Sequence, residues 1–289
     1  GRYTVFGRVT PGQKRKLVKA LQKQGHTVAM TGDGVNDVLA LKDADCGIAM
    51  ASGAEAACHA AQLVLLESNF ACLSEVVAEG RRVINNIQRS ASLFLVKNIF
   101  SFCLSLLTLV VDMPYPLVPI QLSLISSLTI GLPSFVLALE PNRSRVQGKF
   151  MTNVLRGAFP GGLTDLAIVL GLQAFTFAFG FSTQSLSTMA TLCMAMVGMM
   201  VLWQVCKPFD WKRRSLWGGV AAALAFCVLF LRDFFSLSVL GLQEVLVLGV
   251  FWALCWPVMR SILTAFEKGR RLFERLRGRR RQRRGRRAA

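Results

Sequence analysis

Six apolar stretches, each about 20 residues long, constrain the fold of this 289-residue chain more than any other feature. They lie at about 91–111, 117–139, 158–180, 187–206, 215–231 and 244–265. Each is long enough to cross the hydrocarbon core of a bilayer as a helix. Lipid offers the backbone no hydrogen-bond partner, so each stretch must satisfy its own N–H and C=O groups, as an α-helix does. The sequence therefore predicts a transmembrane bundle of about six helices.

Charge is distributed unevenly along the chain. The formal net charge is +18, although 53% of the residues are hydrophobic and the mean hydropathy is +0.46. Residues 1–90 have a mixed, water-compatible composition, whereas the tail at 267–289 carries twelve Lys/Arg and two Glu. We therefore expect an α/β part at 1–69, a connecting stalk helix at 70–90, a membrane part at 91–266 and a basic tail at 267–289.

Lys and Arg also alternate between the connectors that join the apolar stretches. Basic residues follow the second stretch, the fourth stretch and the sixth, whereas the other connectors contain a single Arg, Arg232. By the positive-inside rule, the basic connectors, residues 1–90 and the tail lie on the cytoplasmic side. Six crossings return the chain to the side on which it starts, so the number of stretches agrees with the charge pattern.

The water-compatible region is organised around an acidic turn, TGDGVND, at Thr31–Asp37. An apolar run at 27–30 precedes this turn, and a helix-like segment at 37–43 follows it. This layout is typical of a divalent-metal site at the carboxyl edge of an α/β sheet, because glycines let the backbone approach a ligand. Further strands are expected at 3–9, 46–50 and 62–66, with helices at 12–24 and 54–60. Alternating strands and helices predict βαβ units and a parallel sheet.

The acidic turn, with the ALKDAD and GIAM segments that follow it, resembles the hinge motif of P-type ATPases. These enzymes are a branch of the haloacid-dehalogenase-like phosphotransferases. The resemblance is greatest to bacterial pumps that move calcium or other cations. It implies a partial haloacid-dehalogenase-like (Rossmann-like) α/β domain followed by a stalk and membrane helices five to ten.

P-type enzymes transfer the γ-phosphate of ATP to an aspartate in a DKTGT motif, hydrolyse the aspartyl phosphate and move an ion. The chain contains no DKTGT, no TGE of an actuator domain and no nucleotide-binding domain. The resemblance therefore implies the C-terminal part of such a pump, inactive by itself, whose partner is the missing N-terminal half. The chain also opens on Gly1 in what reads as the middle of a domain.

The resemblance further implies roles for the residues of the turn. Asp33 would bind Mg²⁺ directly, while Asp37 and Asn36 would support the metal and orient the phosphoryl group. Lys14, in the segment RVTPGQK, would contact the phosphoryl group. Mg²⁺ is the implied cofactor, and ATP is the implied substrate, bound mainly by a domain absent from this chain. The remaining residues of the expected catalytic and cofactor-binding turn are Thr31, Gly32 and Gly34.

Polar residues inside the apolar stretches mark candidate paths for an ion. The segment QLSLISSLTIGLP resembles the sixth-helix site of calcium pumps, and its Gly131 and Pro133 predict a helix that is broken midway. A broken helix frees carbonyl groups that can bind a cation. The predicted transport path consists of Lys97, Asn98, Ser101, Ser126 and Thr129. Other polar residues within the stretches are Gln121, Ser123 and Ser127, for which helix packing is favoured, together with Asp165 and Gln204.

The transported ion stays open at this point. Calcium-pump-like sequences carry carboxylates where this chain has Ser101 and Ile130, and Lys97 adds a positive charge beside Asn98. A divalent cation is expected, with Ca²⁺ as the leading candidate. Two other functions fit part of the sequence. One is a membrane-tethered phosphatase, which would need its own nucleophilic aspartate, and the other is a non-catalytic membrane scaffold.

The remaining expectations concern location and partners. The basic tail follows a membrane exit, so anionic lipid headgroups are its expected partner, and no nucleic acid is expected. The eight cysteines form no CxxC pair and no metal-ligand spacing, so a disulfide framework is not expected. The expected location is a bacterial cytoplasmic membrane.

Overall fold

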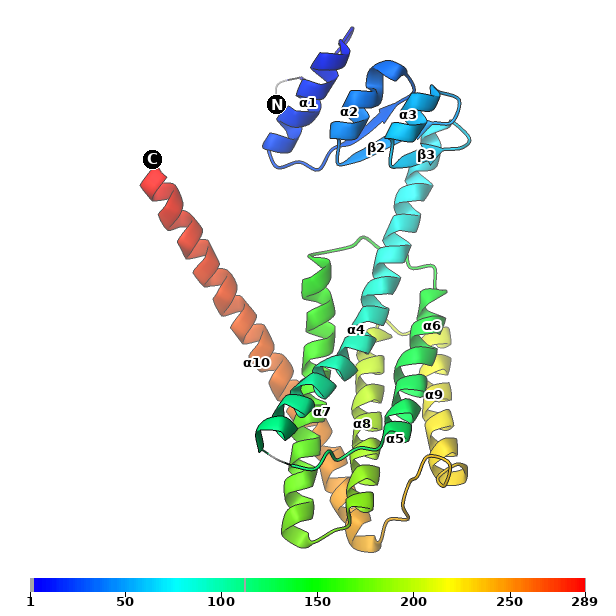
Figure 1. Cartoon of the computed structure of the whole chain (residues 1–289), viewed down its shortest axis with the longest axis vertical. Helices are drawn as coiled ribbons and strands as arrows, with labels where there is room; N and C mark the ends of the chain where they lie inside the picture. Colours follow the sequence, from blue (N-terminus) through cyan, green and yellow to red (C-terminus); the bar gives the residue numbers. More distant parts are fainter. Residues whose placement is uncertain (1–2, 112, 289) are drawn as a thin grey trace. The chain divides into compact units, whose positions relative to one another are not determined.

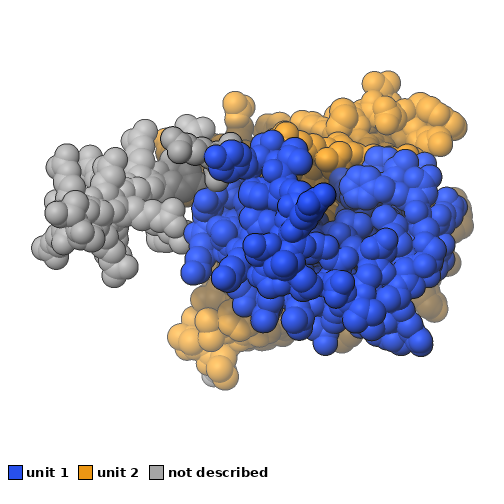
Figure 2. All heavy atoms as spheres, turned by 90° about the horizontal axis from the view of Figure 1, so that it is seen from above, with its two compact units in different colours: residues 1–80 blue, residues 81–289 orange. Residues whose placement is uncertain are grey.

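A computed structural model describes residues 3–111 and 113–288, with side chains described up to Arg270. The chain divides into two compact units, Gly1–Gly80 and Arg81–Ala289, which are coloured separately in Figure 2. Most side chains of the predicted lipid-binding tail, those of residues 271–289, lie outside the described residues.

The first unit contains a small parallel sheet, as the sequence predicts (Figure 1). Its strands pair in the order β1, β2, β3, with Ala29 opposite Cys46 and Ile48 opposite Leu63. Helices α2 and α3 connect the strands, and α1 packs against α2. Leu41, Ala49 and Ala57 are fully buried between these layers. The bounds are α1 Pro11–Lys23, β1 Ala29–Gly32, α2 Val38–Asp43, β2 Cys46–Met50, α3 Glu55–Ala60 and β3 Leu63–Leu65.

The predicted strand at 3–9 is wrong. These residues form no strand, and the side chains of Tyr3 and Val5 are 73% and 85% exposed. Alternation of apolar and polar residues is not sufficient for a strand, because a strand also needs a neighbour that satisfies its N–H and C=O groups. Among the described residues, no strand pairs with this segment.

The second unit is helical, and six helices within the described residues are long and apolar enough to cross a membrane. This confirms the predicted class of fold. Helix α4 starts at Leu73 and runs without interruption to Val111, so the predicted stalk and the first apolar stretch form one helix of 39 residues. The others are α5 Pro119–Ile125 with η3 Ser126–Gly131 and α6 Leu132–Ala138, then α7 Phe150–Phe179, α8 Thr183–Val205, α9 Trp211–Phe230 and α10 Leu242–Ala288.

Helix α8 lies at the centre of this unit (Figure 1). It packs against α5, η3, α7, α9 and α10, and 78% of its most apolar stretch is buried. Helix α7 approaches its neighbours through two glycines. A Cβ at Gly161 would lie 2.7 Å from a methyl of Val201 on α8, and one at Gly162 would lie 2.8 Å from the carbonyl oxygen of Val96 on α4. Small residues of this kind let membrane helices come close together.

The second apolar stretch contains an irregularity where the sequence predicts one, but its form differs from the prediction. The chain does not unwind. Residues Ser126–Gly131 form η3, a π-helical segment between α5 and α6. Pro133 has no N–H to donate to the carbonyl of Thr129, four residues earlier, and a wider turn accommodates this gap while the helix continues.

One end of the helical unit is tied together by charged groups. Glu140, which follows α6, accepts hydrogen bonds from Arg89 Nη1 at 2.6 Å and from Arg213 Nε at 2.7 Å. Arg156 near the start of α7 forms an ion pair with Glu267 late in α10. The α6–α7 connector, the start of α9 and the late part of α10 therefore lie at the same end as Arg89 of α4.

The opposite end is held by uncharged hydrogen bonds. Gln173 on α7 donates to the carbonyl of Pro114 at 3.0 Å. Gln121 on α5 donates to the carbonyl of Ser236, in the α9–α10 connector, at 2.9 Å. Connectors thus alternate along the chain between an end where ion pairs join the helices and an end where neutral hydrogen bonds join them.

Candidate functional site

The acidic turn begins where β1 ends. Gly32 is the last residue of β1, Asp33 follows it directly, and Val35–Asp37 form a single 3₁₀ turn that leads into α2. The two carboxylates differ in environment, because Asp33 is exposed whereas Asp37 is only 6% exposed. Asn36 is also exposed. The turn therefore presents one open and one buried carboxylate at the carboxyl edge of the sheet.

Lys14 and Asp37 come together although 23 residues separate them. Lys14 Nζ on α1 donates to Asp37 Oδ1 at 2.5 Å, and the Lys14 side chain is 34% exposed. Asp37 therefore fixes the position of an ammonium group next to the turn.

Helix α1 is held in place by two more carboxylates. Asp43, at the end of α2, pairs with Arg15 and with Lys19, whose Nζ lies 3.2 Å from Oδ2. The hydrogen bond from Arg15 lowers the pKa of Asp43 below its usual value. The backbone N–H of Val28 donates to Asp45 at 2.8 Å and likewise lowers the pKa of that carboxyl. Both groups stay charged at neutral pH. Asp45 also accepts a hydrogen bond from Gln22 of α1 at 3.3 Å, so both carboxylates keep the helix that carries Lys14 aligned with the sheet.

Two glycines allow the turn to be this compact. A Cβ at Gly32 would lie 2.6 Å from the Cβ of Asp37, so only glycine fits beside that side chain. A Cβ at Gly53 would overlap the backbone carbonyl of Asp33, which also accepts a hydrogen bond from the N–H of Ala54 at 2.6 Å. The backbone of the turn is therefore fixed from both sides.

The chemistry of the turn fits a magnesium ion that is shared with a phosphate group. The Asp33 carboxylate is exposed and makes no hydrogen bond within the described part of the chain, so it is open to a ligand. Mg²⁺ in phosphoryl-transfer sites takes one or two carboxylates, keeps several waters and binds phosphate oxygens. The described residues contain no group of three or more His, Cys, Asp or Glu that could hold a metal ion by themselves.

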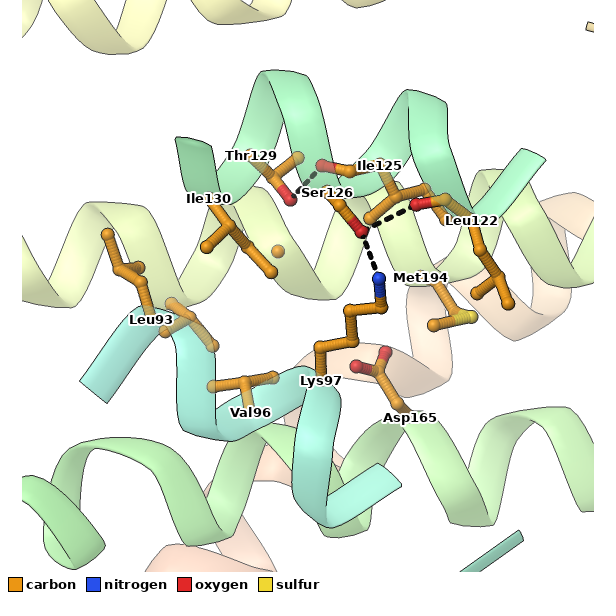
Figure 3. Close-up of a pocket in the computed structure, with 12 residues that line it drawn as sticks. Leu93, Val96, Lys97, Leu122, Ile125, Ser126, Thr129, Ile130, Asp165 and Met194 are labelled. Atoms are coloured by element: carbon orange, nitrogen blue, oxygen red, sulfur yellow. Dashed lines mark hydrogen bonds between the residues drawn. The ribbon is translucent and has the colours of Figure 1, made fainter. Parts of the chain in front are cut away.

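A second polar cluster lies in the helical unit, in a cavity between α4, α5–η3, α7 and α8 (Figure 3). Lys97 Nζ donates to Ser126 Oγ at 2.7 Å. Ser126 Oγ itself donates to the carbonyl of Leu122 at 2.6 Å, and Thr129 Oγ1 donates to the carbonyl of Ile125 at 2.8 Å. Three residues of the predicted transport path, Lys97, Ser126 and Thr129, therefore line one cavity.

The other two residues of the predicted path do not line this cavity. Asn98 is exposed, because neighbouring residues of a helix point about 100° apart and Lys97 faces inward. Ser101 also lies outside the lining. Asp165 on α7 does line it, and the predicted path lacked this residue. The sequence does contain a signal for Asp165, because a carboxylate within a membrane helix is rare and usually functional.

Gln121 serves helix packing, as favoured from the sequence. It is fully buried, and besides its bond to Ser236 its Oε1 accepts a hydrogen bond from Thr191 on α8 at 3.0 Å.

Comparison with known proteins gives matches to both units. A family model described as haloacid dehalogenase-like hydrolase matches residues 1–45. The chain is 44% identical over 247 residues to "Calcium-transporting ATPase CtpE" of Mycobacterium bovis, covering 79% of this chain and 30% of that protein. It is 37% identical over 257 residues to "Probable cation-transporting ATPase exp7" of Streptococcus pneumoniae, covering 85% of this chain and 33% of that protein.

A third relative is more distant. "Calcium-transporting ATPase" of Bacillus subtilis is 35% identical over 222 residues, covering 73% of this chain and 24% of that protein. The matches extend well beyond residues 1–45, so the likeness includes the helical unit. The chain spans about a third or less of the length of the relatives it matches.

Proposed function

Because the chain belongs to the P-type cation-transporting ATPases, we propose that it is part of an ATP-driven pump that moves a divalent cation across a membrane. Ca²⁺ is the leading candidate, since several relatives carry calcium transport in their names. The aspartate that receives the phosphoryl group lies outside these 289 residues, because they contain no DKTGT motif. In this proposal the first unit supplies one half of the phosphoryl-transfer site.

The observation that carries the proposal is the arrangement of Lys14, Asp33 and Asp37 at the edge of the sheet. Asp33 would bind Mg²⁺, and the ion would neutralise negative charge on the phosphoryl group. The Lys14 ammonium, positioned by Asp37 at 2.5 Å, would take part of the charge on the same oxygens. Asn36 would orient the phosphoryl group from the exposed side of the turn, Thr31 and Gly34 would let the backbone approach it, and Gly32 would keep room for Asp37.

The pump would lie in a bacterial cytoplasmic membrane with the charged end of the helical unit on the cytoplasmic side. Arg89 and Arg213 lie at that end with the α6–α7 connector, which also carries Arg143 and Arg145. Lys and Arg concentrate on the cytoplasmic side of membrane proteins. The basic tail would contact anionic lipid headgroups there, at about 1 kcal/mol for each basic residue near the surface.

Phosphorylation of the full-length protein by radiolabelled ATP tests this function. Asp33→Asn removes the metal-binding charge while keeping the shape of the side chain, so we expect phosphoenzyme formation to fall about a hundredfold or more. The steady-state phosphoenzyme is measured in membranes with Mg²⁺ and with Ca²⁺, Mn²⁺ or K⁺ added in turn.

An exposed carboxylate outside the turn provides the control. Glu55 on α3 has a side chain that is 89% exposed, and Glu55→Gln is expected to leave phosphorylation unchanged. Normal phosphoenzyme levels in Asp33→Asn would refute the assignment of Asp33. Absence of any phosphoenzyme in the wild-type protein would refute the proposed function.

A further inference from the structure

The cavity of the helical unit contains a carboxylate that has no partner. Asp165 is only 4% exposed, and its Oδ1 makes no hydrogen bond to any described residue. Figure 3 shows that the side chains of Asp165 and Lys97 both point into the cavity. Lys97 donates to Ser126, and the described residues contain no ion pair between Lys97 and Asp165. A buried carboxylate without a partner is costly, so this position favours a positively charged ligand.

The hydroxyl groups of the cavity are oriented in a way that suits a cation. Ser126 and Thr129 each donate their hydrogen to a carbonyl of the preceding helical turn, those of Leu122 and Ile125. A hydroxyl oxygen that has committed its hydrogen still has lone pairs to offer. Thr129 is 1% exposed, so water does not compete for its oxygen. With Asp165, the cavity therefore presents three oxygens that can accept but not donate.

Lys97 introduces the opposing charge. Its ammonium group already occupies one lone pair of Ser126, at 2.7 Å, and faces the same cavity as Asp165. Two positive charges repel each other strongly where water is scarce. An arriving metal ion and the Lys97 ammonium thus compete for the same oxygens.

We propose that Asp165 is the anionic ligand of a cation site in this cavity, with Ser126 and Thr129 as neutral ligands, and that Lys97 competes with the cation for them. The cavity is neutral when the cation is absent, because the ammonium of Lys97 balances Asp165. Binding displaces the ammonium from Ser126. Oxygen ligands of this type suit a hard cation such as Ca²⁺ or Mn²⁺. The inference rests on the proposed function only in the choice of the cation that is transported.

The other titratable side chains near Asp165 are thiols. Cys255 on α10 donates to the carbonyl of Phe251 at 3.2 Å, and Cys193 on α8 is fully buried. Thiols favour soft metals over hard ones, so these two groups do not replace the oxygen ligands. Lys97 is the charged group that faces Asp165 across the cavity.

Equilibrium binding of radioactive calcium to the full-length protein that contains this chain tests the proposal. The protein is placed in nanodiscs of uncharged phosphatidylcholine without ATP, so neither lipid charge nor phosphorylation contributes. Asp165→Asn is expected to weaken binding at least about tenfold, because the anionic ligand of the proposed site is lost. Lys97→Met is expected to tighten binding about tenfold or more, because the competing charge is lost while the volume is kept.

Two substitutions outside the cavity provide matched controls. Asp233→Asn changes a side chain that is 92% exposed in the α9–α10 connector, and Lys212→Met changes an exposed side chain at the start of α9. Both are expected to keep wild-type affinity. A gain in calcium affinity in Lys97→Met cannot arise from misfolding. The double variant Lys97→Met/Asp165→Asn is expected to lose that gain in affinity.

Several results would overturn the inference. These are equal affinity in the wild type and Asp165→Asn, unchanged or weaker binding in Lys97→Met, and no binding of Ca²⁺ or Mn²⁺ in any variant. The assay uses no ATP, so its outcome is separate from the phosphorylation test. Calcium binding of the expected pattern in a protein that forms no phosphoenzyme would support this site and refute the proposed pump.

Discussion

Gly32 has no Cβ, and the side chain of Asp37 occupies the space where a Cβ would lie. The Lys14–Asp37 pair depends on this space, because Asp37 reaches the ammonium only from its present position. The turn thus has a steric requirement at Gly32 as well as a chemical requirement at its carboxylates. Gly34 has a looser environment, since its Cβ would lie 3.8 Å from Asp37 Oδ2.

Gly32→Ala is expected to impair phosphorylation without removing any charged group. The added methyl would meet Asp37 at 2.6 Å and displace it, and a displacement of about 1 Å can reduce a rate about a hundredfold. The measurement is ATPase activity of the full-length protein, with thermal unfolding as a check of folding. Gly12→Ala on α1, where a Cβ has open space, is the control and is expected to keep full activity. Wild-type activity in Gly32→Ala would contradict the steric argument.

Residues of the acidic turn could be predicted from the sequence, whereas those of the cavity could be predicted only in part. The turn is contiguous, so a short motif contains its carboxylates and glycines together. The cavity collects side chains from several helices, from Lys97 on α4 to Met194 on α8. Which residue of a helix faces inward depends on its rotation about the axis. The adjacent pair Lys97 and Asn98 illustrates this, because only the first lines the cavity.

Among the elements, α7 is notable for its close approach to α4 and α8. Pro160, Gly161 and Gly162 lie in sequence inside this helix, and the two glycines face Val201 and Val96. Asp165 lies three residues beyond Gly162, about one helical turn further along. The close packing of the glycines therefore also sets how far Asp165 reaches into the cavity.

Gly162→Ala is expected to destabilise the helical unit by about 1–3 kcal/mol, because its methyl would lie 2.8 Å from the carbonyl oxygen of Val96. Thermal unfolding in detergent, followed by circular dichroism, measures this. Gly219→Ala on α9 is the matched control, since a Cβ there has no atom within 4 Å. Equal unfolding temperatures for both variants would show that α7 can move away from α4 without cost.

Helices and strands could be predicted from the sequence where the local pattern of apolar and polar residues decides the structure. The crossover β1–α2–β2 follows from apolar runs bounded by glycine and acidic residues. The segment at 3–9 has the alternation of a strand but lacks a strand to pair with, which no local pattern reveals. In the second apolar stretch, Pro133 located the irregularity, but whether the helix unwinds or widens depends on the packing of η3 against α8.

At the scale of the whole molecule, the chain alternates regularly between the two ends of the helical unit. One end gathers Arg89, Glu140 and Arg213, and at the other end neutral hydrogen bonds reach Pro114 and Ser236 from Gln173 and Gln121. The number of crossings and the asymmetry of charge were both visible in the sequence. The pairing of Glu140 with Arg89 and Arg213 could not be seen in the sequence, because the two partners lie 51 and 73 residues away along the chain.

Fusions to the connectors test the resulting topology. A green fluorescent protein fused after Ser144 is expected to fluoresce, because that connector would be cytoplasmic. An alkaline phosphatase fused after Ser236 is expected to be active, because that connector would be on the outer side. Each reporter fused at the other position is the control and is expected to be silent. The reverse pattern of signals would invert the assigned orientation.

The hydroxyl groups of η3 have a consequence for how the cavity tolerates mutation. Ser126 and Thr129 each cover a backbone carbonyl, that of Leu122 or of Ile125. Replacing either residue by alanine removes one oxygen and uncovers another at almost the same place. The uncovered carbonyl needs a new partner, and a bound cation can be that partner. The oxygens of the segment are therefore redundant, whereas Asp165 has no such substitute on α7.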